Sequence, residues 1–142
     1  MTPMKKSWIL LVSLIWFLLA CGDNLKKEND SLKEDVIAIH DEVMPLMGDL
    51  KNYQKQVEKR ISQADSLGMS PEEVADLKVM AGDLGNSFEG MFVWMRQFKS
   101  SYDDMTDEQV RDYLLEQKIL IEKVNADIKK SMDSYKAKFG EK

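Results

Sequence analysis

Apolar residues recur along this chain at steps that alternate between three and four, the spacing of a single helix face. The first such series predicts a helix over residues 32–64. A second, adjacent stripe widens its apolar face, so this helix is expected to contact two neighbours. The first series is Leu32, Val36, Ile39, Val43, Leu46, Leu50, Tyr53 and Val57, and the adjacent stripe is Ile37, His40, Met44 and Met47.

Two further series follow, and each begins with a helix-capping signal. Ser70 with Glu73 and Thr106 with Gln109 have the spacing of capping boxes, and Gly140 is a natural C-terminal cap. The second series is Val74, Leu77, Ala81, Leu84, Phe88, Met91, Met95 and Phe98. The third is Val110, Leu114, Gln117, Ile121, Val124, Ile128, Ser131 and Tyr135.

The connections at residues 65–69 and 99–105 are short, which favours antiparallel neighbours. The sequence therefore predicts an all-α protein, an elongated antiparallel three-helix bundle with coiled-coil-like seams. A helical hairpin that completes its core by dimerising is the alternative. Gly82, Gly85 and Gly90 lie inside the second helix, where each costs ~1 kcal/mol relative to Ala.

The first residues differ from the rest of the chain. Lys5 and Lys6 precede an uncharged, mainly apolar run over residues 8–20, which is shorter than the ~20 apolar residues of a membrane-spanning helix. The run ends at Leu18-Leu19-Ala20-Cys21, which looks like the lipobox at which bacterial lipoproteins are cleaved and acylated. A generic signal peptide with an incidental Cys is the alternative. We expect Cys21 to be the lipidation site.

These features divide the chain into a lipoprotein signal peptide (1–20), a lipidated Cys and tether (21–31) and a helical bundle (32–142). Several acyl chains on Cys21 would hold the protein stably at a membrane. Gly22 at the next position is compatible with outer-membrane delivery under the enterobacterial sorting rule. We therefore expect a lipid-anchored protein of the bacterial cell envelope, at the outer membrane.

Composition excludes several function classes. The chain has 142 residues with a formal net charge of −5, which argues against a nucleic-acid binder that neutralises phosphates. One Cys and one His are too few for a disulfide scaffold, a zinc finger or a His-rich catalytic metal site. No carboxylate pair stands out as an acid/base couple. We expect no enzymatic activity.

One cluster of His, Met and Trp residues is a candidate functional site. Folding the first two helices about Gly68 places His40, Met44, Met47, Met91 and Met95 within about two turns of one level, together with Trp94. Three interpretations remain open. The residues bind a soft metal such as Cu(I), for which thioether and imidazole ligands are suited. They fill the core beside a kink at Pro45. Alternatively, they form an adaptable groove for a helical partner or a second copy.

The stretch from Ile39 to Gly48, which reads Ile-His-Asp-Glu-Val-Met-Pro-Leu-Met-Gly, is distinctive. Together with residues 94–98 it resembles a family of small lipoproteins of the Bacteroidota, often labelled viral A-type inclusion protein. The resemblance implies an envelope lipoprotein rather than an enzyme. We expect a non-enzymatic helical interaction or adaptor module without a cofactor, and periplasmic copper binding is the alternative function.

Overall fold

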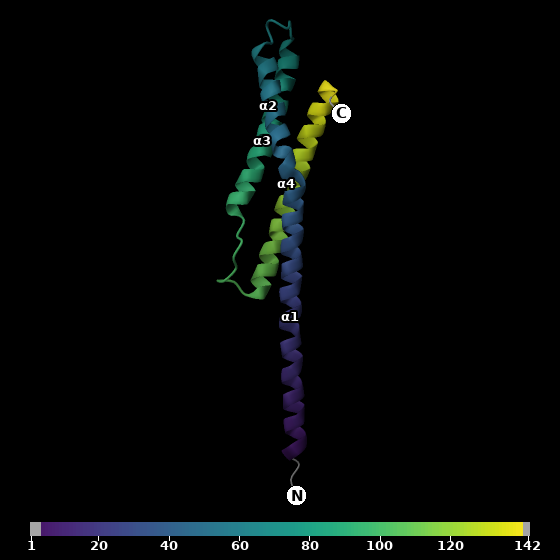
Figure 1. Cartoon of the computed structure of the whole chain (residues 1–142), viewed down its shortest axis with the longest axis vertical. Coiled ribbons are helices and arrows are strands. Elements are labelled where there is room, and N and C mark those ends of the chain that lie inside the picture. The colour runs from purple at the N-terminus through teal and green to yellow at the C-terminus, as the bar shows by residue number, and fades with distance from the viewer. Residues whose placement is uncertain (1–3, 141–142) are drawn as a thin grey trace.

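The structure, a computed structural model, describes residues 4–140, with side chains from residue 24 onward. All regular structure in this range is helical. The elements are α1 (Met4–Val43), the 3₁₀ turn η1 (Met44–Leu46), α2 (Met47–Ser62), α3 (Pro71–Gln97) and α4 (Asp107–Phe139). Figure 1 shows α2 continuing the course of α1, α3 returning beside α2, and α4 running in the direction of α1. The predicted antiparallel three-helix bundle is confirmed.

The first predicted helix is divided by a turn of tighter helix. Pro45 lacks an amide hydrogen and cannot continue the α-helical hydrogen-bond pattern, and η1 occupies this point. The helix also begins well before Leu32. Residues 24–31, which the sequence assigned to a tether, belong to α1, and Asn29 is only 6% exposed. The signal peptide and Cys21 lie outside the residues whose side chains are described.

The starts of α3 and α4 confirm both capping predictions. The hydroxyl of Ser70 accepts from the Glu73 amide, and the Glu73 carboxylate accepts from the Ser70 amide. Thr106 and Gln109 make the same reciprocal pair at the start of α4. At the other end of α4, Gly140 adopts a left-handed conformation with φ of 72° and ends the helix as predicted.

Polar contacts set the register between the first and last helices. The Nδ2 atom of Asn29 donates to the carbonyl of Asp107 over 2.8 Å, and Lys118 pairs with Asp35 at 2.7 Å. Farther along, the hydroxyl of Tyr135 donates to the side chain of Gln56 over 2.7 Å. Because residue numbers rise together on both sides of these contacts, α4 runs parallel to α1 and α2.

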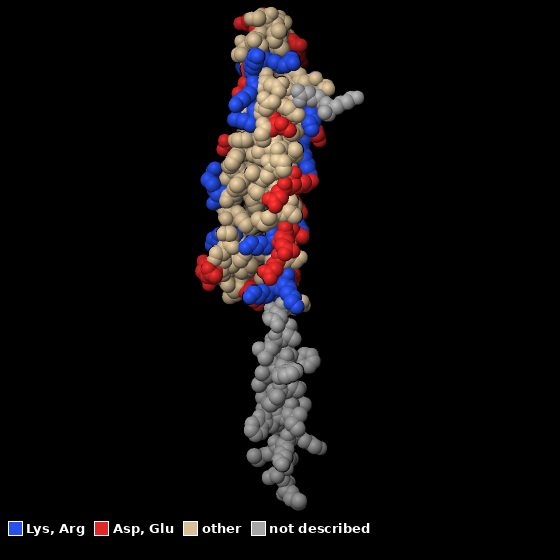
Figure 2. All heavy atoms as spheres, viewed as in Figure 1, with Lys and Arg blue, Asp and Glu red and all other residues tan. Residues whose placement is uncertain are grey.

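The helices differ in which neighbouring helix they mainly pack against. In the described range, α1 packs mainly on α4, whereas α2 packs mainly on α3, and α3 also packs on α4. Residues of the predicted stripes supply most of the core, including the stacked rings of Tyr53 and Tyr135, whose centroids are 4.0 Å apart. Figure 2 shows charges of both signs scattered along the visible face of the bundle.

Candidate interaction site at the end of α3

His40 and Trp94 meet where α1 passes the last turns of α3. Their ring centroids lie 5.6 Å apart with the planes tilted by 33°. The Nδ1 atom of His40 lies 2.8 Å from a carboxylate oxygen of Asp41, and the imidazole side chain is 17% exposed. Trp94 is 5% exposed and stacks on Phe98 with centroids 4.9 Å apart. The predicted proximity of His40 and Trp94 is confirmed.

The four predicted methionines lie in different environments. Met91 is fully buried, Met47 is 6% exposed, and the half-buried Met44 packs against the core that contains them. Met95 is 40% exposed. The sequence placed Met95 in the same core-facing stripe as Met91, so the expectation that the stripe stays packed to the end of α3 is wrong at this position.

The exposure of Met95 follows from the side of α3 that faces the other helices. Gln54 reaches Gly85, and the ammonium of Lys51 lies over the ring of Phe88, which fixes the antiparallel register of α2 and α3. In this register the start of α2 at Met47 lies near the level of Met91. Beyond that level the residue of α3 that faces the bundle is Trp94, which is buried and lies against His40 of α1. Met95 follows Trp94 by one residue, about 100° around the helix, and is therefore turned away from this packed side.

The side of α4 that carries Tyr113 also has an exposed apolar residue. Two contacts fix α3 against α4: Phe98 stacks with Tyr113 at 6.3 Å, and the Ser87 hydroxyl donates to the carbonyl of Asp127 over 3.2 Å. Leu120 lies between these levels and seven residues after Tyr113, so it is on the same side of α4. It is 40% exposed. We refer to these two exposed apolar residues, Met95 and Leu120, together as the apolar patch.

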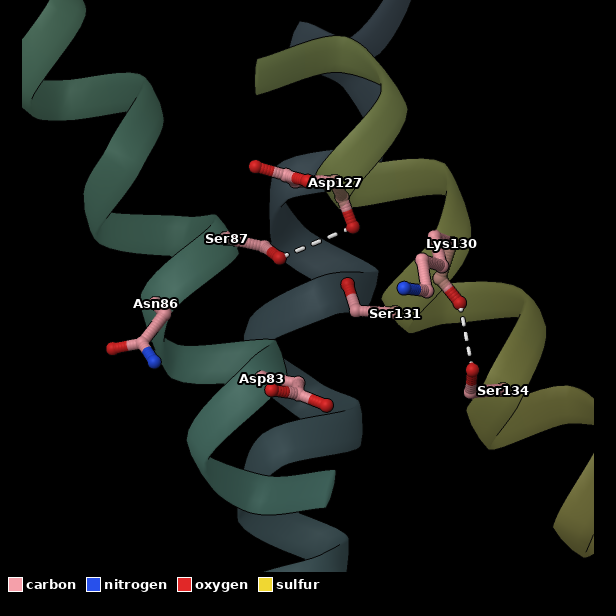
Figure 3. A pocket seen from close by; sticks show the side chains of 7 residues that line it. All are labelled: Asp83, Asn86, Ser87, Asp127, Lys130, Ser131 and Ser134. Carbon is pink, nitrogen blue, oxygen red and sulfur yellow. Dashed lines mark hydrogen bonds between the residues drawn. The ribbon is translucent and has the colours of Figure 1, made fainter. Parts of the chain in front are cut away.

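Nearer the C-terminal end of α4, the same interface is polar. A shallow groove of about 230 Å³ lies there, and it is lined by Asp83, Asn86, Ser87, Asp127, Lys130, Ser131 and Ser134. Figure 3 shows Ser87 reaching towards α4, while Asn86 points away from it. The hydroxyls of Ser87 and Ser134 donate to helix carbonyls, the latter to that of Lys130 over 2.9 Å. These two hydroxyls therefore have a structural use in this interface.

A polar cluster fixes the C-terminal end of α1 on α4. The amide of Asn125, which is 7% exposed, donates to the carbonyl of Ile39 over 3.2 Å and to the Glu42 carboxylate over 2.8 Å. Lys129 also donates to that carboxylate. The hydrogen bonds from Lys129 and Asn125 lower the pKa of Glu42 below its ordinary value of 4.5.

The described residues contain no group of three or more His, Cys, Asp and Glu side chains arranged to hold a metal ion. In the same range no helix combines the length and the apolar character needed to cross a membrane. The chain matches no protein-family model, no curated protein and no solved structure.

Sequence reasoning missed the buried polar residues that fix the helices on one another. Asn29, Asn125 and Ser87 are each less than a tenth exposed, although none lies in a predicted apolar stripe. Asn125 and Ser87 lie next to a seam, whereas Asn29 lies three residues before Leu32 and continues the first series. Each amide or hydroxyl donates to a backbone carbonyl of a neighbouring helix. The only sequence signal was a small polar residue beside a seam or just before its first apolar residue, which also describes many solvated positions.

Proposed function

We propose that this chain is a lipid-anchored, non-enzymatic interaction module of the bacterial cell envelope. The order of Lys5-Lys6, the apolar run and Cys21 supports the anchor, as does the resemblance to small lipoproteins. The elongated bundle supports the module, because its length presents side chains far from the anchored end. The His, Met and Trp residues of the candidate site include no nucleophile paired with a base.

One observation carries the interaction role. The heptad series of α3 continues in the sequence through Met95, yet Met95 is 40% exposed, and Leu120 on α4 is also 40% exposed. Exposed apolar side chains beside an otherwise packed seam are typical of a surface that a partner covers. Met95 is also unbranched and polarizable, which lets it adapt to the shape of a bound side chain.

The occupant that fits this surface is an amphipathic helix of another envelope protein. Met95 and Leu120 belong to two helices that pack on each other, so a third helix laid along α3 and α4 could cover both side chains. The chain has a formal net charge of −5, which favours a partner helix with Lys or Arg on its polar face. A second copy of this chain, with the same negative charge, is the less favourable occupant.

Photo-crosslinking tests this proposal in native membranes. A photoreactive residue at position 95 is expected to give one discrete adduct, and Leu120→Glu is expected to abolish it without changing the thermal midpoint. Val79, which is on α3 and 65% exposed, is the matched control position and should give no adduct. An adduct of twice the chain mass would instead identify a homodimer. Equal labelling from positions 79 and 95 would refute a specific surface.

The anchor has its own test. Cys21→Ser should move the protein from the membrane fraction to the soluble fraction, because the acyl chains attach at this thiol. Retention of the Cys21→Ser protein in the membrane would mean that the N-terminal segment is an uncleaved anchor. This result would refute lipidation but would leave the apolar patch untouched.

Copper binding is the second candidate function, and the arrangement of His40 favours it. Its Nδ1 atom is engaged by Asp41, while no hydrogen-bond partner contacts Nε2 among the described residues. A carboxylate on one ring nitrogen is the usual support for a metal bound at the other. Met44 follows one helical turn later and is half-buried. Competition titration with Cu(I), comparing the chain with His40→Ala, should show one bound ion that the variant loses; equal binding would refute this role.

A further inference from the structure

The outer side of α4 carries an apolar pair that no helix of the described range covers. Ile119 is 68% exposed, the largest exposed fraction among the large apolar side chains described, and Leu115 is 44% exposed. The two lie four residues apart, about one helical turn, so they share one side of α4. Ile119 precedes the buried Ile121 by two residues, about 200° around the helix, so this side faces away from the core.

The charges on this side of α4 are distributed unevenly about Ile119. Before Ile119 the exposed charged side chains on this side are carboxylates, whereas two cations lie after it. The earlier residues are Glu108, Asp112 and Glu116, and the later ones are Glu122, Lys123 and Lys130. Glu116 makes no ion pair among the described side chains, and the cation nearest to it in the sequence, Lys118, pairs with Asp35 at 2.7 Å. We call Leu115, Glu116, Ile119 and Lys123 the outer face of α4.

Glu116 and Lys123 complement each other across two chains but not within one. They lie seven residues apart on one side of α4, which separates them by about 10.5 Å along the helix axis. Lys123 pairs instead with Asp127 at 2.6 Å, and its side chain remains 72% exposed. Glu116 precedes Ile119 by three residues and Lys123 follows it by four. A second α4 that runs in the opposite direction, with the two Ile119 residues in contact, therefore places each Glu116 nearly level with Lys123 of the other copy.

We propose that the outer face of α4 binds the same face of a second copy of this chain, as an antiparallel dimer with two-fold symmetry. Ile119 lies at the two-fold axis and packs on Ile119 of the second copy, with Leu115 beside it. The symmetry then generates two equivalent ion pairs, each between Glu116 of one copy and Lys123 of the other. The dimer thus covers the most exposed apolar side chain and gives the unpaired carboxylate a cation.

A second copy fits this face better than an anionic membrane or a uniformly basic helix does. The carboxylates before Ile119 repel an anionic lipid surface, and a uniformly basic helix would bring its cations against Lys123. The formal net charge of −5 on each copy opposes association only at long range, where salt screens it with a Debye length of ~8 Å. The outer face includes neither Met95 nor Leu120, so this inference goes beyond the partner proposed for the apolar patch and does not depend on it.

Charge exchange in native membranes tests the dimer. A photoreactive residue at position 119 of the full chain is expected to give an adduct of twice the chain mass that contains two copies with different epitope tags. Glu116→Lys should reduce this adduct about tenfold, because it replaces two attractive pairs by two repulsive ones. Combining Glu116→Lys with Lys123→Glu should restore the adduct, since opposite charges again face each other across the axis. Restoration requires a second copy, because the two positions do not meet within one chain.

Glu89→Lys is the matched control, because Glu89 is an exposed carboxylate on α3, away from the outer face. Alone it should leave the adduct unchanged, and with Lys123→Glu it should not restore it. Circular dichroism should give Glu116→Lys the thermal midpoint of the parent, since Glu116 makes no ion pair that holds the fold. Equal effects of Glu116→Lys and Glu89→Lys, or an adduct that the exchanged pair does not restore, would overturn the proposal. An adduct from position 119 with a different protein alone would likewise overturn it.

Discussion

Replacing Gly82 and Gly90 by Ala should stabilise the bundle. Both lie inside α3, where Gly is less favourable than Ala by about 0.8–1.0 kcal/mol. An added Cβ at either position meets nothing within 4 Å, so no steric loss offsets the gain in helix propensity. Neither residue has the positive φ that would make Gly necessary. The two substitutions are distant enough to add, which gives roughly 1.5–2 kcal/mol for the pair.

Two other glycines supply controls for this reasoning. Gly68 has a φ of 63°, so Gly68→Ala forces a side chain into the left-handed region and should destabilise by about 1 kcal/mol. At Gly85 the added Cβ would lie 2.9 Å from Nε2 of Gln54. Gln54 also bonds to Lys51 and Glu58, so Gly85→Ala should gain less than Gly82→Ala.

Thermal unfolding followed by far-ultraviolet circular dichroism measures these effects. For a domain of this size, 1 kcal/mol corresponds to roughly 3–6 °C, so the double variant should melt about 5–10 °C higher. Urea unfolding with an unchanged m-value would confirm that only stability changed. A lower midpoint for Gly82→Ala or Gly90→Ala would refute the reasoning, because it would mean that another surface packs closely on this face of α3.

Three further predictions test the contacts that fix α4. Glu42→Gln should lower the thermal midpoint at about pH 7, because Lys129 and Asn125 depress the pKa of Glu42 and so stabilise the fold through its carboxylate. This stabilisation is present at pH values above the unfolded-state pKa of about 4.5 and is lost as the pH falls through the lower folded-state pKa. The midpoints of the variant and the parent should therefore converge at low pH. Asn125→Ala should cost about 1–3 kcal/mol in urea unfolding, because a buried carbonyl of α1 and Glu42 lose a donor. Thr106→Ala should cost ~1 kcal/mol by removing the cap of Gln109, and Thr106→Ser should restore it; equal losses would contradict a capping role.

The sequence predicted the local features because local chemistry determines them. The capping boxes at Ser70 and Thr106 and the left-handed Gly140 each depend on residues within one turn. The alternating steps of three and four likewise identify most of the core. The proximity of His40 and Trp94 followed from one assumption, that the first two predicted helices fold back about Gly68.

Met95 shows what the apolar repeat cannot predict. Met95 belongs to the same apolar series as the buried Met91, so the sequence contains no local signal that Met95 is exposed. What differs is the residue that faces the other helices: beyond Met91 it is Trp94, which is buried against His40 of α1, so Met95 at the next position is turned outward. A periodic stripe predicts which side of a helix is apolar, but only the arrangement of the other helices decides how much of that side is covered. The exposed part of the stripe is therefore the surface at which we propose that a partner binds.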